Sequence, residues 1–138
     1  MAWVSSDTTD TEKHIEELAA RYDIDILWSE HPHAPCAYSW YKMVKIRPTT
    51  TPARYIEGLH ELGHCLNHNA KRFEKLWGKG KHGGRSYDTE LLCEAGAWAW
   101  AWHHVDPEFA EAFGKKMAQH TAACLASYLV QVPVHKDT

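Results

Sequence analysis

The residues with the clearest capacity for chemistry are in the segment HELGH, at positions 60–64. On a helix, His60 and His64 lie one turn apart and project from the same side. Their imidazoles can then reach one zinc ion at about 2.0–2.1 Å each. Glu61 lies next to them, where its carboxylate can contact a water molecule instead of the metal. This spacing predicts a metal site with Glu61 as a base.

A catalytic zinc ion usually has three protein ligands and one position for water, so a third ligand is needed. His68 lies two turns from His60 on one straight helix, which makes it unsuitable for the same ion. The best candidates are Glu90 and Glu94, one turn apart on the next predicted helix. We expect one of them to bind the metal and the other to contact a ligand histidine. Glu90 has an alternative role as an acidic residue at a helix start.

A peptidase would also need a donor that stabilises the negative oxygen of the transition state. Tyr87 and His82 are our candidates, with Arg85 and His103 or His104 as weaker ones. For each of these side chains a surface or packing role is the more common one.

The helix that carries the motif is well marked. Thr51 can cap its start, Pro52 suits the first helical position, and it should end within 67–70. The histidines point away from an apolar stripe, so one side can be buried while the other presents ligands. Gly63 is a poor helix former, which points to a close packing contact there. The apolar stripe consists of Tyr55, Leu59, Leu62 and Leu66.

The part of the chain before this helix contains helical and strand patterns. Residues 1–9 are polar and expected to be frayed, and 10–22 have the periodicity of a helix. The segment DIDILW (23–28) favours a short strand. A longer strand is predicted over AYSWYKMVKI (37–46), with a turn that can interrupt it.

Two helices are predicted after the motif. The alternating segment AWAWAW (97–102) could equally suit a strand. We predict a helix over 88–104 because alanine favours helices and the flanking ELLCEA continues the same segment. Asp106 is a suitable cap for a last helix that runs to about Leu129, and 133–138 should be frayed. Between the motif and these helices, 71–86 is basic and glycine-rich, and we interpret it as a solvated loop.

Composition is that of one soluble domain over residues 1–138, with a formal net charge of −3 that gives no general attraction to nucleic acid or membrane. The basic loop at 71–86 is the one feature that suggests binding to nucleic acid. No apolar run is long enough to span a membrane, and the four cysteines form no C-x-x-C pair. We therefore expect a cytoplasmic protein with reduced thiols. The sequence carries no signal for an oligomeric state.

With these pieces in place, the chain resembles the gluzincin-type zinc metallopeptidases, and most closely the minimal bacterial and phage proteins of the ImmA/IrrE group. The matching segments are HELGH at 60–64 and EAGAWAWA at 94–101. The resemblance implies that His60, His64 and Glu94 bind one zinc ion per chain and that Glu61 is the catalytic base. The second segment follows the family pattern in part, so Glu90 stays an alternative third ligand.

The resemblance also implies a fold, an α+β minimal zincin-like domain. A small twisted sheet would pack against the active-site helix, together with two or three further helices. An edge strand of such a sheet lines the cleft and holds an extended peptide, and YKMVKI (41–46) is our candidate for that strand.

The expected function is hydrolysis of a peptide bond in a specific protein substrate, by a metal-activated water with Glu61 as general base. A phage or bacterial regulatory setting is implied by the resemblance. The alternative is a non-catalytic zinc-binding module with a regulatory or interaction role. The presence of Glu61 favours the enzyme, because a purely structural zinc site has no use for a base.

Overall fold

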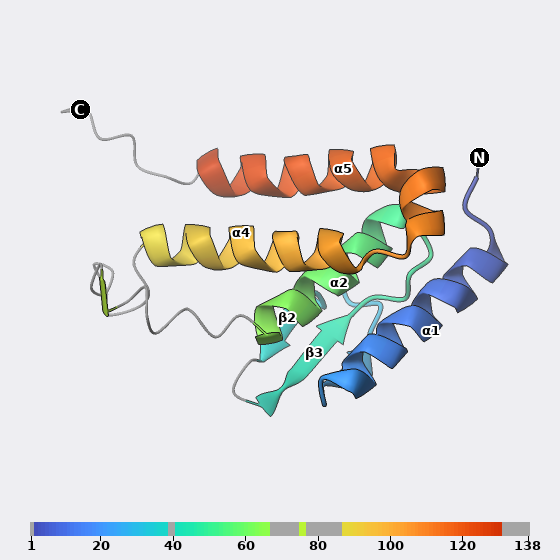
Figure 1. Ribbon diagram of the computed structural model, residues 1–138, viewed down its shortest axis with the longest axis horizontal. Helices are drawn as coiled ribbons and strands as arrows, with labels where there is room; N and C mark the ends of the chain where they lie inside the picture. Colours follow the sequence, from blue (N-terminus) through green and yellow to red (C-terminus); the bar gives the residue numbers. More distant parts are fainter. Residues whose placement is uncertain (1, 39–40, 67–74, 77–86, 131–138) are drawn as a thin grey trace.

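The computed structural model of the protein describes residues 2–38, 41–66, 75–76 and 87–130. Figure 1 shows a small sheet with helices packed beside it, which confirms the predicted α+β class. In chain order the elements are α1 (Ser5–Arg21), β1 (Asp25–Trp28), β2 (Cys36–Tyr38), β3 (Met43–Ile46), α2 (Pro52–Leu66), α4 (Tyr87–His104) and α5 (Pro107–Val130).

Helix α1 begins at Ser5, earlier than the start at residue 10 that the periodicity predicts. The Asp7 carboxylate accepts a hydrogen bond from the Val4 backbone N–H at 2.9 Å, which satisfies a donor just before the helix. Ahead of it, the Trp3 indole N–H donates to the Thr49 carbonyl oxygen at 2.9 Å. The same ring packs edge-on against Phe113. These contacts give residues 3–9 a defined structure in place of the expected fraying.

The sheet has the strand order β1-β3-β2, with β1 parallel and β2 antiparallel to β3. The predicted long strand at 37–46 is therefore two strands joined by a turn, where Lys42 has a positive φ of 47°. The prediction that 41–46 forms an edge strand is wrong, because β3 pairs on both sides. Val44 pairs with Ile26 of β1 and with Ala37 of β2.

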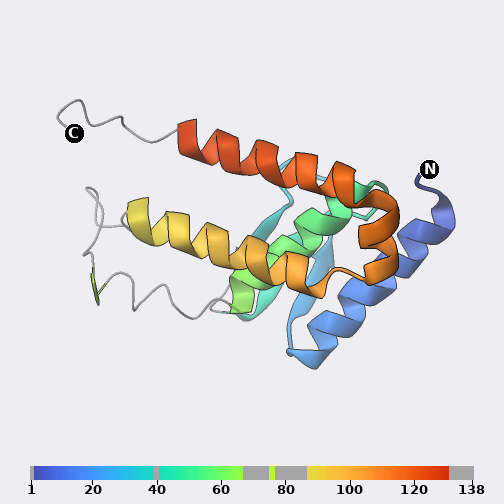
Figure 2. The same ribbon diagram turned by 45° about the horizontal axis from the view of Figure 1, so that its top comes forward.

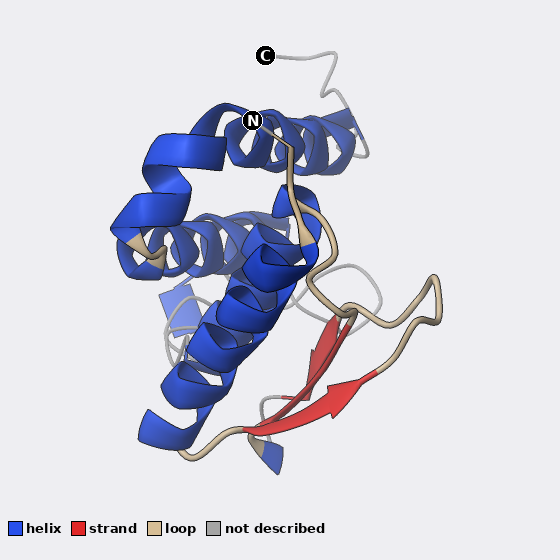
Figure 3. Ribbon diagram, turned by 90° about the vertical axis from the view of Figure 1, so that its right-hand side faces the viewer, coloured by secondary structure: helices blue, strands red, loops and turns tan. Residues whose placement is uncertain are grey.

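The long helices lie on one side of this sheet (Figure 3). Val44 and Ile46 of β3 are buried under them, whereas Met43 and Lys45 alternate on to the other face and are half-buried. Leu27 of β1 is 49% exposed. One face of the sheet thus contributes to the core and the other faces away from it.

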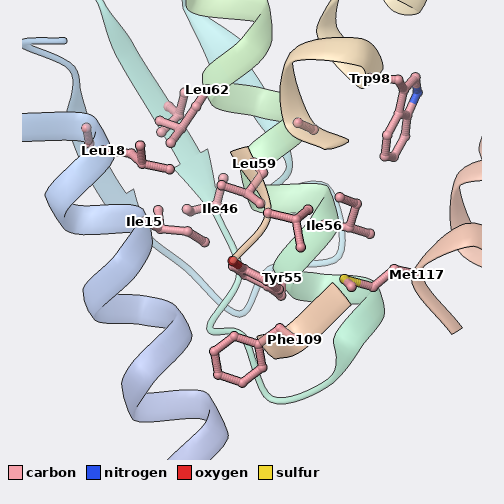
Figure 4. Close-up of a cluster of buried hydrophobic side chains, with 14 of the residues drawn as sticks. Ile15, Leu18, Ile46, Tyr55, Ile56, Leu59, Leu62, Trp98, Phe109 and Met117 are labelled. Carbon is pink, nitrogen blue, oxygen red and sulfur yellow. The ribbon is translucent and has the colours of Figure 1, made fainter. Parts of the chain in front are cut away.

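The core lies between the sheet and the helices, with α2 at its centre (Figure 4). Ile15 and Leu18 of α1 meet Ile46 of β3 on one side of α2. Phe109 and Met117 of α5 pack on another side. Because most other elements contact α2, the position of this helix is fixed from several directions.

Helix α2 confirms the predicted cap and stripe. The Thr51 hydroxyl accepts a hydrogen bond from the Arg54 backbone N–H at 3.2 Å. Burial extends beyond the stripe, however, because His60 and Glu61 are 8% and 7% exposed. The ligand side of the helix is therefore covered by other elements. In the stripe Tyr55, Leu59 and Leu62 are fully buried and Leu66 is half-buried.

Helices α4 and α5 follow as predicted, and Figure 2 shows α5 running back along α4. Asp106 caps α5, since its Oδ1 accepts a hydrogen bond from the Glu108 backbone N–H at 2.9 Å. Between the two helices the Trp102 indole N–H donates to the Thr121 hydroxyl at 3.2 Å. Among the described residues, no helix has the length and apolar character needed to cross a membrane.

Candidate metal centre

Helix α2 places the two histidines of the motif side by side. The ring centroids of His60 and His64 are 4.4 Å apart. Glu94 of α4 lies opposite them, with Oε2 2.9 Å from His60 Nε2 and Oε1 2.9 Å from His64 Nε2. One carboxylate thus contacts both imidazoles. These three side chains form a group whose ligand atoms all lie within 4.8 Å of one another.

The close approach of α4 to α2 depends on Gly63, which lies between the histidines. A Cβ atom at this position would be 2.6 Å from the Ala97 carbonyl oxygen and 3.0 Å from the Ala97 Cα. The missing side chain allows the two backbones to touch, as the sequence predicted for this glycine. Glu94 is one turn before Ala97 on α4, so this contact brings its carboxylate level with the histidines.

The group has the composition and spacing of a metal site. Tetrahedral coordination with bonds of 2.0–2.1 Å places ligand atoms about 3.4 Å apart. The observed 2.9 Å separations are slightly shorter, so a small side-chain movement is enough to admit an ion. Three protein ligands would leave one coordination position for water, which is the arrangement of catalytic zinc sites. His60, His64 and Glu94 can therefore hold a metal ion.

The charges of the group are strongly coupled. Burial alone would raise the pKa of Glu94, but hydrogen bonds from His60 and His64 outweigh it and lower this pKa to about 2. Burial works against the charged form of His60, but hydrogen bonds to Glu61 and Glu94 outweigh it and raise its pKa to about 9. A metal ion that binds His60 through Nε2 must displace the proton held there, so its binding releases a proton.

Glu61 is buried beside the group without belonging to it. Its Oε1 lies 3.4 Å from His60 Nδ1, on the opposite edge of the ring from Glu94. His60 Nε2 can thus bind a metal while its Nδ1–H still faces the Glu61 carboxylate. Glu61 is thus held in direct contact with a ligand histidine of the candidate metal centre.

Three residues near the group were missed by the sequence analysis as parts of the site. Trp98 of α4 stacks on the His60 ring, with centroids 3.9 Å apart and planes at 14°. Glu57 lies one turn before Glu61 and pairs with Arg47 at 2.9 Å. His120 of α5 approaches Glu57, with 3.7 Å between Nε2 and Oε1. Helical spacing from the motif could have indicated Glu57, but no sequence signal connects it with α5.

The other predicted site residues have different positions. Glu90 is exposed, and it is Glu94 that completes the cluster within the described part of the chain. His104 stacks on Trp100, and its Nδ1 is 2.8 Å from the Trp100 carbonyl oxygen. The nearby His103 is exposed. The calls on His68, His82, Arg85, the Tyr87 side chain and the loop at 71–86 fall outside the described residues, apart from 75–76.

The chain was compared with known proteins at the level of families, sequences and structures. No protein-family model matches it, and neither a curated protein nor a solved structure does so.

Proposed function

We propose that this protein is a zinc-dependent peptidase whose ion is held by His60, His64 and Glu94, with Glu61 as general base. The observation that supports it best is the meeting of Glu94 with both motif histidines beside Glu61. A structural zinc site is normally closed by four protein ligands. A three-ligand group with an adjacent buried carboxylate corresponds instead to a catalytic arrangement.

The donor set favours zinc among the common metals. Imidazole nitrogens suit zinc, copper, iron and nickel, whereas magnesium and calcium prefer oxygen ligands throughout. Two nitrogens and one carboxylate are a common ligand set of zinc hydrolases. A bound zinc ion supplies a Lewis acid that polarises a carbonyl group and acidifies water.

The remaining roles, proton transfer and orientation of the ligands, would fall to side chains of the protein. Glu61 accepts a proton from the attacking water and passes it to the leaving amine. Trp98 holds the His60 ring in place by stacking, which fixes the direction of Nε2. The Glu61 carboxylate facing Nδ1 supports the same orientation.

The substrate would bind as an extended peptide along β2. Cys65, directly after His64, contacts the Met43 carbonyl oxygen at 3.5 Å, and Met43 pairs with Tyr38 of β2. This places β2 beside the end of α2 that carries the metal ligands. On its outer side β2 pairs with no strand in the described residues, so a peptide can add there through backbone hydrogen bonds.

The test is the substitution Glu61→Gln, which keeps the shape of the side chain and removes its basicity. The variant should bind one zinc ion per chain by elemental analysis. It should cleave peptides about 10²–10⁴-fold more slowly than the wild type, the usual contribution of a general base. Cleavage would be followed by mass spectrometry on a peptide library, with His60→Ala as the variant that loses zinc.

Two results would contradict the proposal. Absence of zinc from the wild type after incubation with the metal would show that the cluster is no zinc site. Stoichiometric zinc without cleavage of any peptide would favour the alternative, a zinc-binding regulatory module.

A further inference from the structure

A shallow concave surface lies at the opposite edge of the sheet from β2. It is a groove of about 460 Å³ between α1 and β1. The strand order puts β3 between this groove and β2, so it is separate from the strand proposed to bind substrate. Its lining residues are Glu16, Ala19, Ala20, Asp23, Ile24, Asp25, Ile26 and Trp28.

The backbone of β1 is available on the groove side. Asp25 N–H donates to the Lys42 carbonyl and Ser29 N–H to the Ile46 carbonyl, at 2.8 and 2.9 Å, so these residues face the β3 side. Along a parallel strand, alternate residues direct their backbone N–H and C=O groups to opposite sides. The backbone N–H and C=O groups of Ile26 and Trp28 therefore point away from β3. No strand pairs with β1 on that side within the described ranges.

The chemistry of the groove selects for one kind of partner. Its lining includes three exposed carboxylates, from Glu16, Asp23 and Asp25, and no cation among the residues that the structure describes. Lys42 lies nearby, but its Nζ is engaged with the Tyr22 carbonyl oxygen at 3.2 Å. The half-buried side chains of Ile26 and Trp28 supply apolar surface between the acids.

We propose that the β1 edge is a docking site for an extended cationic peptide segment of another protein. Such a segment would add to β1 as a further strand through backbone hydrogen bonds. Its apolar residues would cover Ile26 and Trp28, and its lysine or arginine side chains would pair with the carboxylates. A second copy of this chain is a poor occupant, because two such edges would bring their acids together.

The experiment measures binding of a fluorescent ten-residue peptide of alternating lysine and valine to the full chain by fluorescence anisotropy. We expect saturable binding that weakens with salt and no binding of the matched glutamate–valine peptide. The double substitution Glu16→Gln, Asp25→Asn should weaken it about three- to tenfold, as expected for two exposed ion pairs. The double substitution Glu17→Gln, Glu108→Gln neutralises two exposed acids outside the groove and should change binding less than twofold.

A lysine–valine peptide with alternate amides N-methylated tests strand addition without altering the protein. It should bind at least about tenfold more weakly, since the backbone bonds to β1 cannot form. Equal binding of the methylated peptide, or of the Glu16/Asp25 double variant, would overturn the proposal. So would a concentration-dependent dimer in gel filtration whose formation abolishes peptide binding, because the edge would then hold a second copy. Binding alone is read out, so the result does not depend on peptidase activity.

Discussion

Among single residues, Glu94 connects the two histidines of the candidate metal centre, because its two oxygens contact different imidazoles. Glu94→Ala should therefore weaken zinc binding by more than the roughly 10–100-fold typical of losing an outer partner of a ligand. Glu90→Ala is the matched control, since Glu90 is the other acid considered and is exposed. It should change zinc affinity less than about tenfold, measured by competition with a chromophoric chelator. Equal losses in both variants would contradict the assignment of Glu94.

The sequence predicted this part of the site well but incompletely. His60 and His64 follow from helical spacing, because one turn of helix fixes their relation. Glu90 and Glu94 are also one turn apart, so periodicity places both on one face and cannot choose between them. The choice between them depends on the axial position of α4 relative to α2, which is set by tertiary packing. For the same reason His120 of α5 could not be connected with Glu57.

At the scale of elements, the contact between α2 and α4 should be sensitive to Gly63. Gly63→Ala would normally favour a helix, but here the new methyl group meets the Ala97 backbone. We expect it to lower the free energy of unfolding by about 1–3 kcal/mol and to weaken zinc binding as Glu94 moves away. Urea denaturation and the same zinc competition would measure the two effects.

Gly114 of α5 provides the control for this prediction. Apart from the backbone of its own helix, a Cβ atom there meets no described atom within 4 Å, so Gly114→Ala should raise the free energy of unfolding by up to about 1 kcal/mol. Zinc affinity should not change. If Gly63→Ala behaved like Gly114→Ala, the close approach of α2 and α4 would not be a requirement of the site.

The elements themselves were largely predictable, and the exceptions have physical causes. Caps at Thr51 and Asp106 act locally, so the starts of α2 and α5 could be read from the sequence. The early start of α1 depends on Trp3 reaching Thr49, a contact between distant parts of the chain. The central position of β3 depends on which strands pair with one another. Alternation of side chains predicts that a segment is a strand, but it does not predict the strands beside it.

For the molecule as a whole, a series of hydrogen bonds connects α1, α2 and the start of α5. One member of the series is a histidine, so we expect it to make stability depend on pH. The Tyr55 hydroxyl accepts a hydrogen bond from the Asp106 backbone N–H at 3.1 Å. The same hydroxyl is hydrogen-bonded to His14 Nδ1 at 2.7 Å. Burial lowers the pKa of His14 from its ordinary value of 6.5. The folded state therefore favours the neutral ring.

Because the pKa of His14 is lower in the folded state, the unfolded chain binds the proton more readily. This contribution to stability is fully present above pH 6.5 and is lost as the pH falls towards the folded value. His14→Gln, which cannot titrate, should show a smaller decrease in the free energy of unfolding between pH 7 and 5 than the wild type. Urea denaturation at each pH gives the comparison, and identical pH profiles would contradict this role of His14.

The strand order has a consequence for synthesis of the chain on the ribosome. In the described residues, β1 and β2 each pair with β3, which is the last of the three to be made. A nascent chain ending at Tyr38 contains two strands that have no partner and cannot pair with each other in the native arrangement. At a synthesis rate of about 5–20 residues per second, they wait for Met43–Ile46 to leave the exit tunnel. The sheet is therefore completed from its middle, and the two outer strands are joined to it at the same stage of translation.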